Sequence, residues 1–154
     1  MELGRPGDAV DHFEASARLK PDSAAAHYNL ATALTLSGRL GEAVEEYGRA
    51  LQLRPDYARA HNNLGDVLLR RGQADEALRH FREALRIDPR YAEAHYNAGS
   101  VLRSQARWSD AIDHFRRAAE LELGLTPAVT SLAWLLATVV DAALRNPAEA
   151  ARRR

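Results

Sequence analysis

Histidine is the residue type in this sequence whose spacing most directly suggests chemistry, because a neutral imidazole binds transition metals. Six histidines are present, and His27, His61 and His95 recur at one constant interval. Equivalent residues of successive packed helices lie roughly 10 Å apart, whereas zinc holds nitrogen ligands at about 2.0–2.1 Å. The remaining three histidines are separated in the same way. The spacing therefore predicts no metal site and no bound cofactor.

Other catalytic arrangements are not found in the sequence. Cysteine is absent, which excludes thiolate catalysis, disulfides and cysteine-ligated zinc. There is no phosphate-binding loop and no nucleophile elbow. The acids Glu42, Glu76 and Asp110 also recur at the interval of the histidines, on a helix side expected to face solvent. The sequence predicts that the protein is not an enzyme, unless it is the targeting domain of a larger one.

Charge and hydropathy exclude two further classes of partner. The 21 basic and 21 acidic residues give a formal net charge of zero, whereas nucleic-acid binders usually carry a basic surplus. The most apolar stretch, residues 128–140, contains threonine and serine and is shorter than the roughly 20 residues that span a bilayer. The first residues lack the apolar run of a signal peptide. We expect a cytoplasmic protein without nucleic-acid or membrane partners.

The elements that position these residues follow from an internal repeat. Pro21, Pro55 and Pro89 are separated by the same interval as the histidines, and the intervening segments align without gaps. Each segment contains two amphipathic helical patterns, with a turn at Gly38, Gly72 or its counterpart Ala106. Proline disfavours helical geometry in the residue before it, so each second helix ends there.

This pattern resembles the tetratricopeptide repeat, a family with a period of about 34 residues, small residues where paired helices approach, and an aromatic in the second helix. The interval between the prolines has the length of that period, and small pairs such as Gly65 and Ala77, together with Phe81, occupy the expected places. The resemblance implies an all-α fold, a right-handed superhelical solenoid of antiparallel helix pairs. We expect a second helix of an incomplete repeat in 1–23, repeats in 24–57, 58–91 and 92–125, and an incomplete repeat or capping helix in 126–154.

The first helix of each repeat carries polar residues opposite its core positions, and in this family the first helices line a concave groove. The groove would bind an extended peptide or a partner helix. The candidate groove residues are Tyr28, Asn29, Thr32, Leu36, Arg59, Asn62, Asn63, Asp66, Arg70, Glu93, Tyr96, Asn97, Ser100, Arg103 and Trp134.

Asn29, Asn63 and Asn97 recur at one place in the three first helices. A carboxamide both donates and accepts hydrogen bonds, so a row of them could bind a peptide backbone. The spacing resembles the asparagine ladder of the repeat domain of O-linked N-acetylglucosamine transferases. The alternative is that these asparagines are repeat consensus, exposed or bonded within their own helices. A carboxylate clamp for chaperone tails is disfavoured, because only Asn63 matches it and Glu93 would repel the ligand.

The two ends of the repeat array predict self-association. Val10 and Phe13 belong to a second helix whose first helix is missing, and the last long helix is apolar nearly all round, as buried helices are. We expect a fragment of a longer protein, or a homodimer formed through the terminal helices. A structural self-assembly module that uses its ends is the alternative function. The candidate self-association residues are Val129, Leu132, Trp134, Leu135, Leu136 and Val139.

Overall fold

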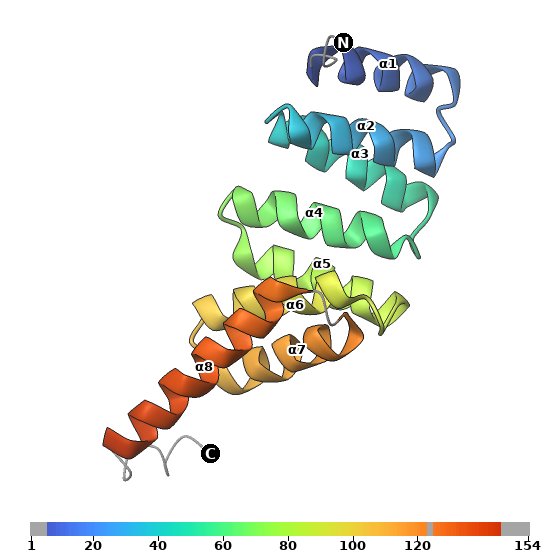
Figure 1. Cartoon of the computed structure of the whole chain (residues 1–154). Coiled ribbons are helices and arrows are strands. Elements are labelled where there is room, and N and C mark those ends of the chain that lie inside the picture. The colour runs from blue at the N-terminus through green and yellow to red at the C-terminus, as the bar shows by residue number, and fades with distance from the viewer. Residues whose placement is uncertain (1–5, 123–124, 146–154) are drawn as a thin grey trace. The chain divides into compact units, whose positions relative to one another are not determined.

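The structure is a computed structural model that describes residues 6–122 and 125–145 (Figure 1). The described part of the chain contains α-helices joined by turns, and no strand. The all-α fold predicted from the repeat is confirmed. The helices are α1 (Pro6–Leu19), α2 (Ala24–Leu36), α3 (Leu40–Leu53), α4 (Ala58–Arg70), α5 (Ala74–Ile87), α6 (Ala92–Ser104), α7 (Trp108–Leu121) and α8 (Thr126–Arg145).

The helices form two compact units, α1–α5 in the first and α6–α8 in the second. In the first unit, α2 pairs with α3 and α4 with α5, while α1 packs on α2 and α3 on α4. The helices α2 and α4 also contact each other directly. In the second unit, α7 packs against both α6 and α8. Each predicted repeat therefore supplies one helix pair.

The turn within each pair depends on a residue with left-handed backbone geometry. Gly38 and Gly72 have φ angles of +76° and +79°, which glycine adopts without steric cost. Ala106 takes the same place in the third repeat with a φ of +57°. Its Cβ makes this geometry cost roughly 1–2 kcal/mol. The turns lie where the sequence predicts them, and the third one is strained.

Small residues in the first helices make room for a buried aromatic from the second. A Cβ added to Gly65 would lie 2.6 Å from a ring carbon of Phe81, and one added to Gly99 would lie 3.0 Å from Phe115. Both phenylalanine side chains are fully buried. The expectation that small residues permit close helix approach is confirmed at these two positions.

The N-terminal end differs from the prediction. We expected Val10 and Phe13 to lack a packing partner, but Val10 is only 1% exposed and Phe13 is half-buried. The reason is that α1 packs on α2. The first helix of the following repeat thus packs on α1, whose Val10 is buried.

The C-terminal helix also differs from the prediction. Leu135, a candidate self-association residue, is fully buried within its own chain, as is Ala128. Both belong to α8, which packs on α7. Leu135 is therefore a core residue, and its prediction as a self-association residue was wrong. The helix α8 continues to Arg145. Residues 146–154 of the expected incomplete repeat or capping helix lie outside the described residues. Among those residues, no helix is long and apolar enough to cross a membrane.

Candidate functional site

The polar faces of α2 and α4 form the candidate surface in the first unit. These helices contact each other, and their groove residues differ in exposure. Asn29, Arg59, Asp66 and Arg70 are exposed. The exposed set carries both charge signs as well as a carboxamide. It can therefore donate and accept hydrogen bonds without demanding a charged ligand.

Asn62 was predicted to line the groove, but the structure buries it. Its side chain is only 1% exposed, and its amide nitrogen lies 3.4 Å from the side-chain oxygen of Asn63. Tyr28 and Tyr96 occupy the equivalent place in the other repeats and are half-buried. This place lies at the edge between the polar and core faces, so a short side chain there is covered where a tyrosine emerges.

A cluster of tyrosines supports the surface of the first unit. The ring of Tyr28 lies 5.8 Å from that of Tyr47 and 4.9 Å from that of Tyr57, measured between centroids. The amide of Asn63 donates to the Tyr28 hydroxyl at 3.0 Å, and the hydroxyls of Thr32 and Tyr47 are 3.1 Å apart. Burial raises the pKa of Tyr47, so its phenol stays protonated. These packed tyrosines form an uncharged cluster.

The three asparagines of the proposed ladder differ in exposure and in hydrogen bonding. Asn63 already donates one amide hydrogen to Tyr28. Asn29 is exposed and makes no side-chain hydrogen bond within the part of the chain described by the structure. Asn97 is half-buried and has a partner of its own. Asn29 is thus the member best placed to bind a ligand.

The second unit presents a corresponding face on α6. Glu93 is exposed, whereas Tyr96, Ser100 and Arg103 are half-buried. Tyr96 packs against the buried ring of Phe115 with centroids 5.7 Å apart, and the Ser100 hydroxyl donates to the carbonyl of Tyr96 at 3.0 Å. The guanidinium of Arg103 lies over the Phe115 ring, 5.9 Å from its centroid.

An open pocket of about 470 Å³ lies between α6, α7 and α8, and it contains both tryptophans of the chain. We call it the tryptophan pocket. Sequence reasoning placed Trp134 on the groove face but missed Trp108. The available signal was that Trp108 begins the second helix, where the other repeats carry Leu40 and Ala74. The lining residues are Arg103, Ser104, Trp108, Thr130, Ser131 and Trp134.

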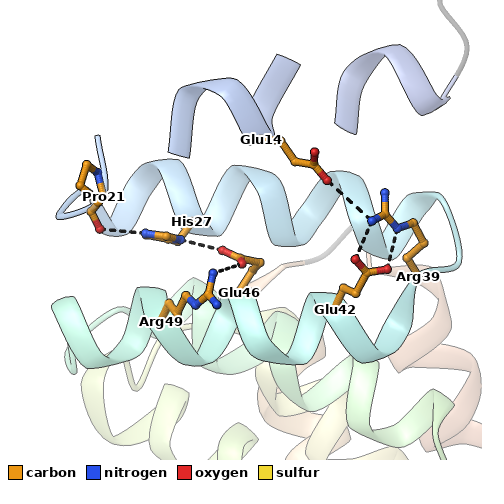
Figure 2. A network of polar contacts seen from close by, with 7 residues as sticks. All are labelled: Glu14, Pro21, His27, Arg39, Glu42, Glu46 and Arg49. Carbon is orange, nitrogen blue, oxygen red and sulfur yellow. Dashed lines mark hydrogen bonds and ion pairs between the residues drawn. The ribbon is translucent and has the colours of Figure 1, made fainter. Parts of the chain in front are cut away.

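A second pocket, of about 420 Å³, lies in the first unit and is lined by residues of α1, α2 and α3. Figure 2 shows the polar network around it, in which the ring of His27 is held between Pro21 and Glu46. His27 Nε2 donates to the Pro21 carbonyl at 2.9 Å, and Nδ1 lies 2.6 Å from Glu46 Oε2. Arg49 donates to the other Glu46 oxygen at 2.5 Å. The carboxylate is thus satisfied from both sides.

The same network neutralises the other end of this pocket. Arg39 forms a bidentate contact with Glu42, at 2.7 and 2.5 Å, and lies 3.6 Å from Glu14 on α1 (Figure 2). Hydrogen bonding to Arg39 lowers the pKa of the Glu42 carboxyl. Because Glu14, Glu42 and Glu46 have cationic partners here, we interpret the network as structural.

The histidines are closer together than the sequence suggested. His61 pairs with His80 and His95 with His114, with Nδ1 atoms 3.0 and 3.1 Å apart. Sequence reasoning considered only equivalent histidines of successive repeats and missed this pairing within each repeat. Each pair offers two ligands, and the described residues contain no group of three potential metal ligands.

The direction of the hydrogen bond between His61 and His80 follows from the contact of His61 with Pro55. His61 Nε2 donates to the Pro55 carbonyl at 3.1 Å, so in the neutral ring Nδ1 is an acceptor. His80 then donates from its own Nδ1. Burial lowers the pKa of His80, and the neighbouring His61 lowers it further. His80 is therefore neutral near pH 7, and the pair links α4 to α5, as Glu46 links α3 to α2.

Comparisons with known proteins agree with the geometry. A family model described as tetratricopeptide repeat matches residues 22–90 and 56–122, which together span most of the 154 residues. No curated protein sequence matches the chain significantly. The crystal structure of MamA is 28% identical, with a TM-score of 0.73, and the match covers 79% of this chain and 71% of MamA.

Two other solved structures are similar to the chain. The crystal structure of YrrB, described as a TPR protein with an unusual peptide-binding site, is 26% identical with a TM-score of 0.73 over 82% of this chain and 65% of YrrB. The first TPR of Spaghetti (RPAP3), bound to an HSP90 peptide, is 17% identical with a TM-score of 0.74 over 77% of this chain and 94% of that one. At that identity the second likeness shows the fold alone.

Proposed function

Because the chain belongs to the tetratricopeptide-repeat family, we propose that it is a non-catalytic interaction protein that binds an extended peptide or a partner helix on the exposed faces of its first helices. The observation that carries this proposal is the face formed by α2 and α4. There Asn29, Arg59 and Asp66 are exposed, and Tyr28 of the same face packs against Tyr47 and Tyr57. Exposed polar groups that include both donors and acceptors can pair with the main chain of a peptide.

The ligand need not be strongly charged. In the first unit, the exposed groove residues include the basic Arg59 and Arg70 and the acidic Asp66. In the second unit, Arg103 and Glu93 carry opposite charges. The similarity to YrrB, whose structure is described by its peptide-binding site, supports a peptide ligand. Backbone hydrogen bonds to carboxamides would supply affinity that tolerates different peptide sequences.

We expect Asn29→Ala to weaken binding of the best peptides from a peptide array by about 5-fold, the equivalent of one hydrogen bond. The triple variant N29A, N63A and N97A should weaken binding further. Affinities would be measured by fluorescence anisotropy with the labelled peptides. Asn29 is the cleanest single test, since Asn63→Ala also removes the hydrogen bond to Tyr28.

The matched control is Gln52→Ala, which removes an exposed carboxamide from α3, outside the first helices. It should bind like the wild type. Equal affinities for the wild type and the triple variant would remove the asparagines from the site.

Self-association through α8 is a second candidate function. Because Leu135 is buried, the exposed apolar residues of α8 are the candidates for this contact. Val129 and Leu136 are 46% and 41% exposed, and Leu132 is half-buried. Their three- and four-residue spacings put them on one helical face, the core side of a repeat's first helix. Trp134 lies on a different face, in the tryptophan pocket. Val139 lies where the structure describes no side chains. We propose that the Val129–Leu136 face binds its counterpart in a homodimer.

Multi-angle light scattering across a dilution series tests the dimer. Val129→Glu and Leu136→Glu should each convert it to monomer, because a charge would be buried without a partner. Leu36→Glu is the control, since Leu36 is 79% exposed on α2 and should leave the dimer intact. A monomer of 17.0 kDa at high micromolar concentration would contradict this second candidate function.

A further inference from the structure

We propose that the tryptophan pocket binds one apolar side chain of an extended peptide together with the carboxylate of an adjacent aspartate or glutamate. This inference rests on the proposed function and assigns the ligand chemistry of its second-unit surface. The pocket lies where α6, α7 and α8 meet. Its apolar walls and the guanidinium of Arg103 define the two parts of the ligand.

The apolar part follows from the tryptophans. The chain has two, and Trp108 and Trp134 are 36% and 54% exposed. Both line the same pocket although they belong to different helices. Tryptophan carries the largest apolar surface of any side chain and is enriched among the residues that dominate binding energy. Two partly exposed rings on one pocket are an anchor site for an apolar side chain.

The acidic part follows from Arg103. Other arginines of this unit, such as Arg107 and Arg116, are held by the carboxylates of Asp110 and Asp113. Arg103 instead lies over the ring of Phe115, and it makes no ion pair with any residue that the structure describes. This contact leaves the N–H groups of the guanidinium available to a ligand, and their geometry suits a carboxylate.

The remaining lining residues suit a peptide backbone. Thr130 and Ser131 bring hydroxyl groups from α8, and the hydroxyl of Ser104 donates to the carbonyl of Val101 at 2.7 Å. Hydroxyls both donate and accept hydrogen bonds, so they can pair with main-chain groups on either side of the anchor. Because the proposed function places an extended chain here, we assign the carboxylate to an internal acidic residue rather than to a chain terminus.

Intrinsic fluorescence provides the test, since every tryptophan of the full chain lies in the pocket. The probes are hexapeptides with blocked ends that contain a central Leu-Asp. Matched peptides contain Leu-Lys or Ala-Asp, and a fourth ends in leucine with a free carboxylate. We expect the Leu-Asp peptide to shift the emission saturably. The Leu-Lys and Ala-Asp peptides should bind at least about 10-fold more weakly.

Calorimetric titration then measures the variants. Arg103→Gln should weaken the Leu-Asp peptide by roughly 10- to 100-fold, as expected for a lost charged hydrogen bond, and Trp134→Ala by at least as much. Leu53→Ala, at an exposed leucine on α3 outside the first helices, should bind like the wild type. Circular dichroism of each variant separates loss of contact from loss of fold.

Several outcomes would overturn the assignment. They are equal binding of the Leu-Lys and Leu-Asp peptides, binding of the free-carboxylate peptide alone, or no saturable emission change with any peptide. An emission shift on concentrating the protein without peptide would instead make a second copy the occupant. Weaker binding of the array peptides by N29A, with no binding of the Leu-Asp peptide, would contradict the pocket and leave the proposed function standing. Peptide binding in the pocket that survives R103Q would contradict the acidic part.

Discussion

Gly65→Ala is expected to lower the free energy of unfolding by roughly 1–3 kcal/mol, the usual cost of overpacking a core. The new Cβ would lie 2.6 Å from Cε1 of Phe81, a distance that real Cβ contacts essentially never show. The phenylalanine ring is fully buried and cannot move aside without displacing its neighbours. The gain in helix propensity on replacing glycine, at most about 1 kcal/mol, offsets only part of this cost.

The control is Gly48→Ala in α3. A Cβ at Gly48 meets nothing within 4 Å, so the helix-propensity gain should appear alone and raise the free energy of unfolding by about 0.5–1 kcal/mol. Urea unfolding followed by circular dichroism measures both variants. If Gly65→Ala stabilised the protein as Gly48→Ala does, the close packing of α4 on α5 would be contradicted.

Glu46→Ala is expected to lower the free energy of unfolding by about 2 kcal/mol at pH 7. Glu46 and His27 are nearly buried, with side chains 10% and 9% exposed, and their closest atoms are 2.6 Å apart. Removing the carboxylate leaves Nδ1 of His27 without this partner in a covered site. The cost stays below the roughly 3–5 kcal/mol of a broken buried ion pair, because Nε2 of His27 keeps its hydrogen bond to the Pro21 carbonyl.

Glu42→Ala is the matched comparison in the same helix. Glu42 also pairs with an arginine, Arg39, but both side chains are substantially exposed, at 53% and 42%. Solvent screens such pairs, so this variant should unfold close to the wild type. Thermal unfolding of the two variants side by side is the measurement. Equal destabilisation would show that burial of the His27–Glu46 pair contributes nothing.

The sequence by itself determined the repeat and most of the fold. A proline, a histidine and an asparagine each recur along the chain at this one constant period. Helical periodicity then assigns one face of each helix to the core. The turns at Gly38 and Gly72 and the close approach at Gly65 follow from glycine's lack of a side chain. These features depend on local geometry, which a single sequence carries.

The tertiary structure alone decided how much of each face remains available. Periodicity gives the direction of Asn62 and Leu135 but not what covers them, and both are buried. It also could not show that Asn63 is bonded to Tyr28.

The histidine pairs and the tryptophan pocket are tertiary features as well. His61 meets His80 on the neighbouring helix, and Trp108 shares a pocket with Trp134 on another helix. Such contacts depend on how neighbouring helices pack, and repeat spacing fixes the place of a residue within its own helix only. The candidate site therefore emerges from the packing of helices, while the fold emerges from the pattern of the chain.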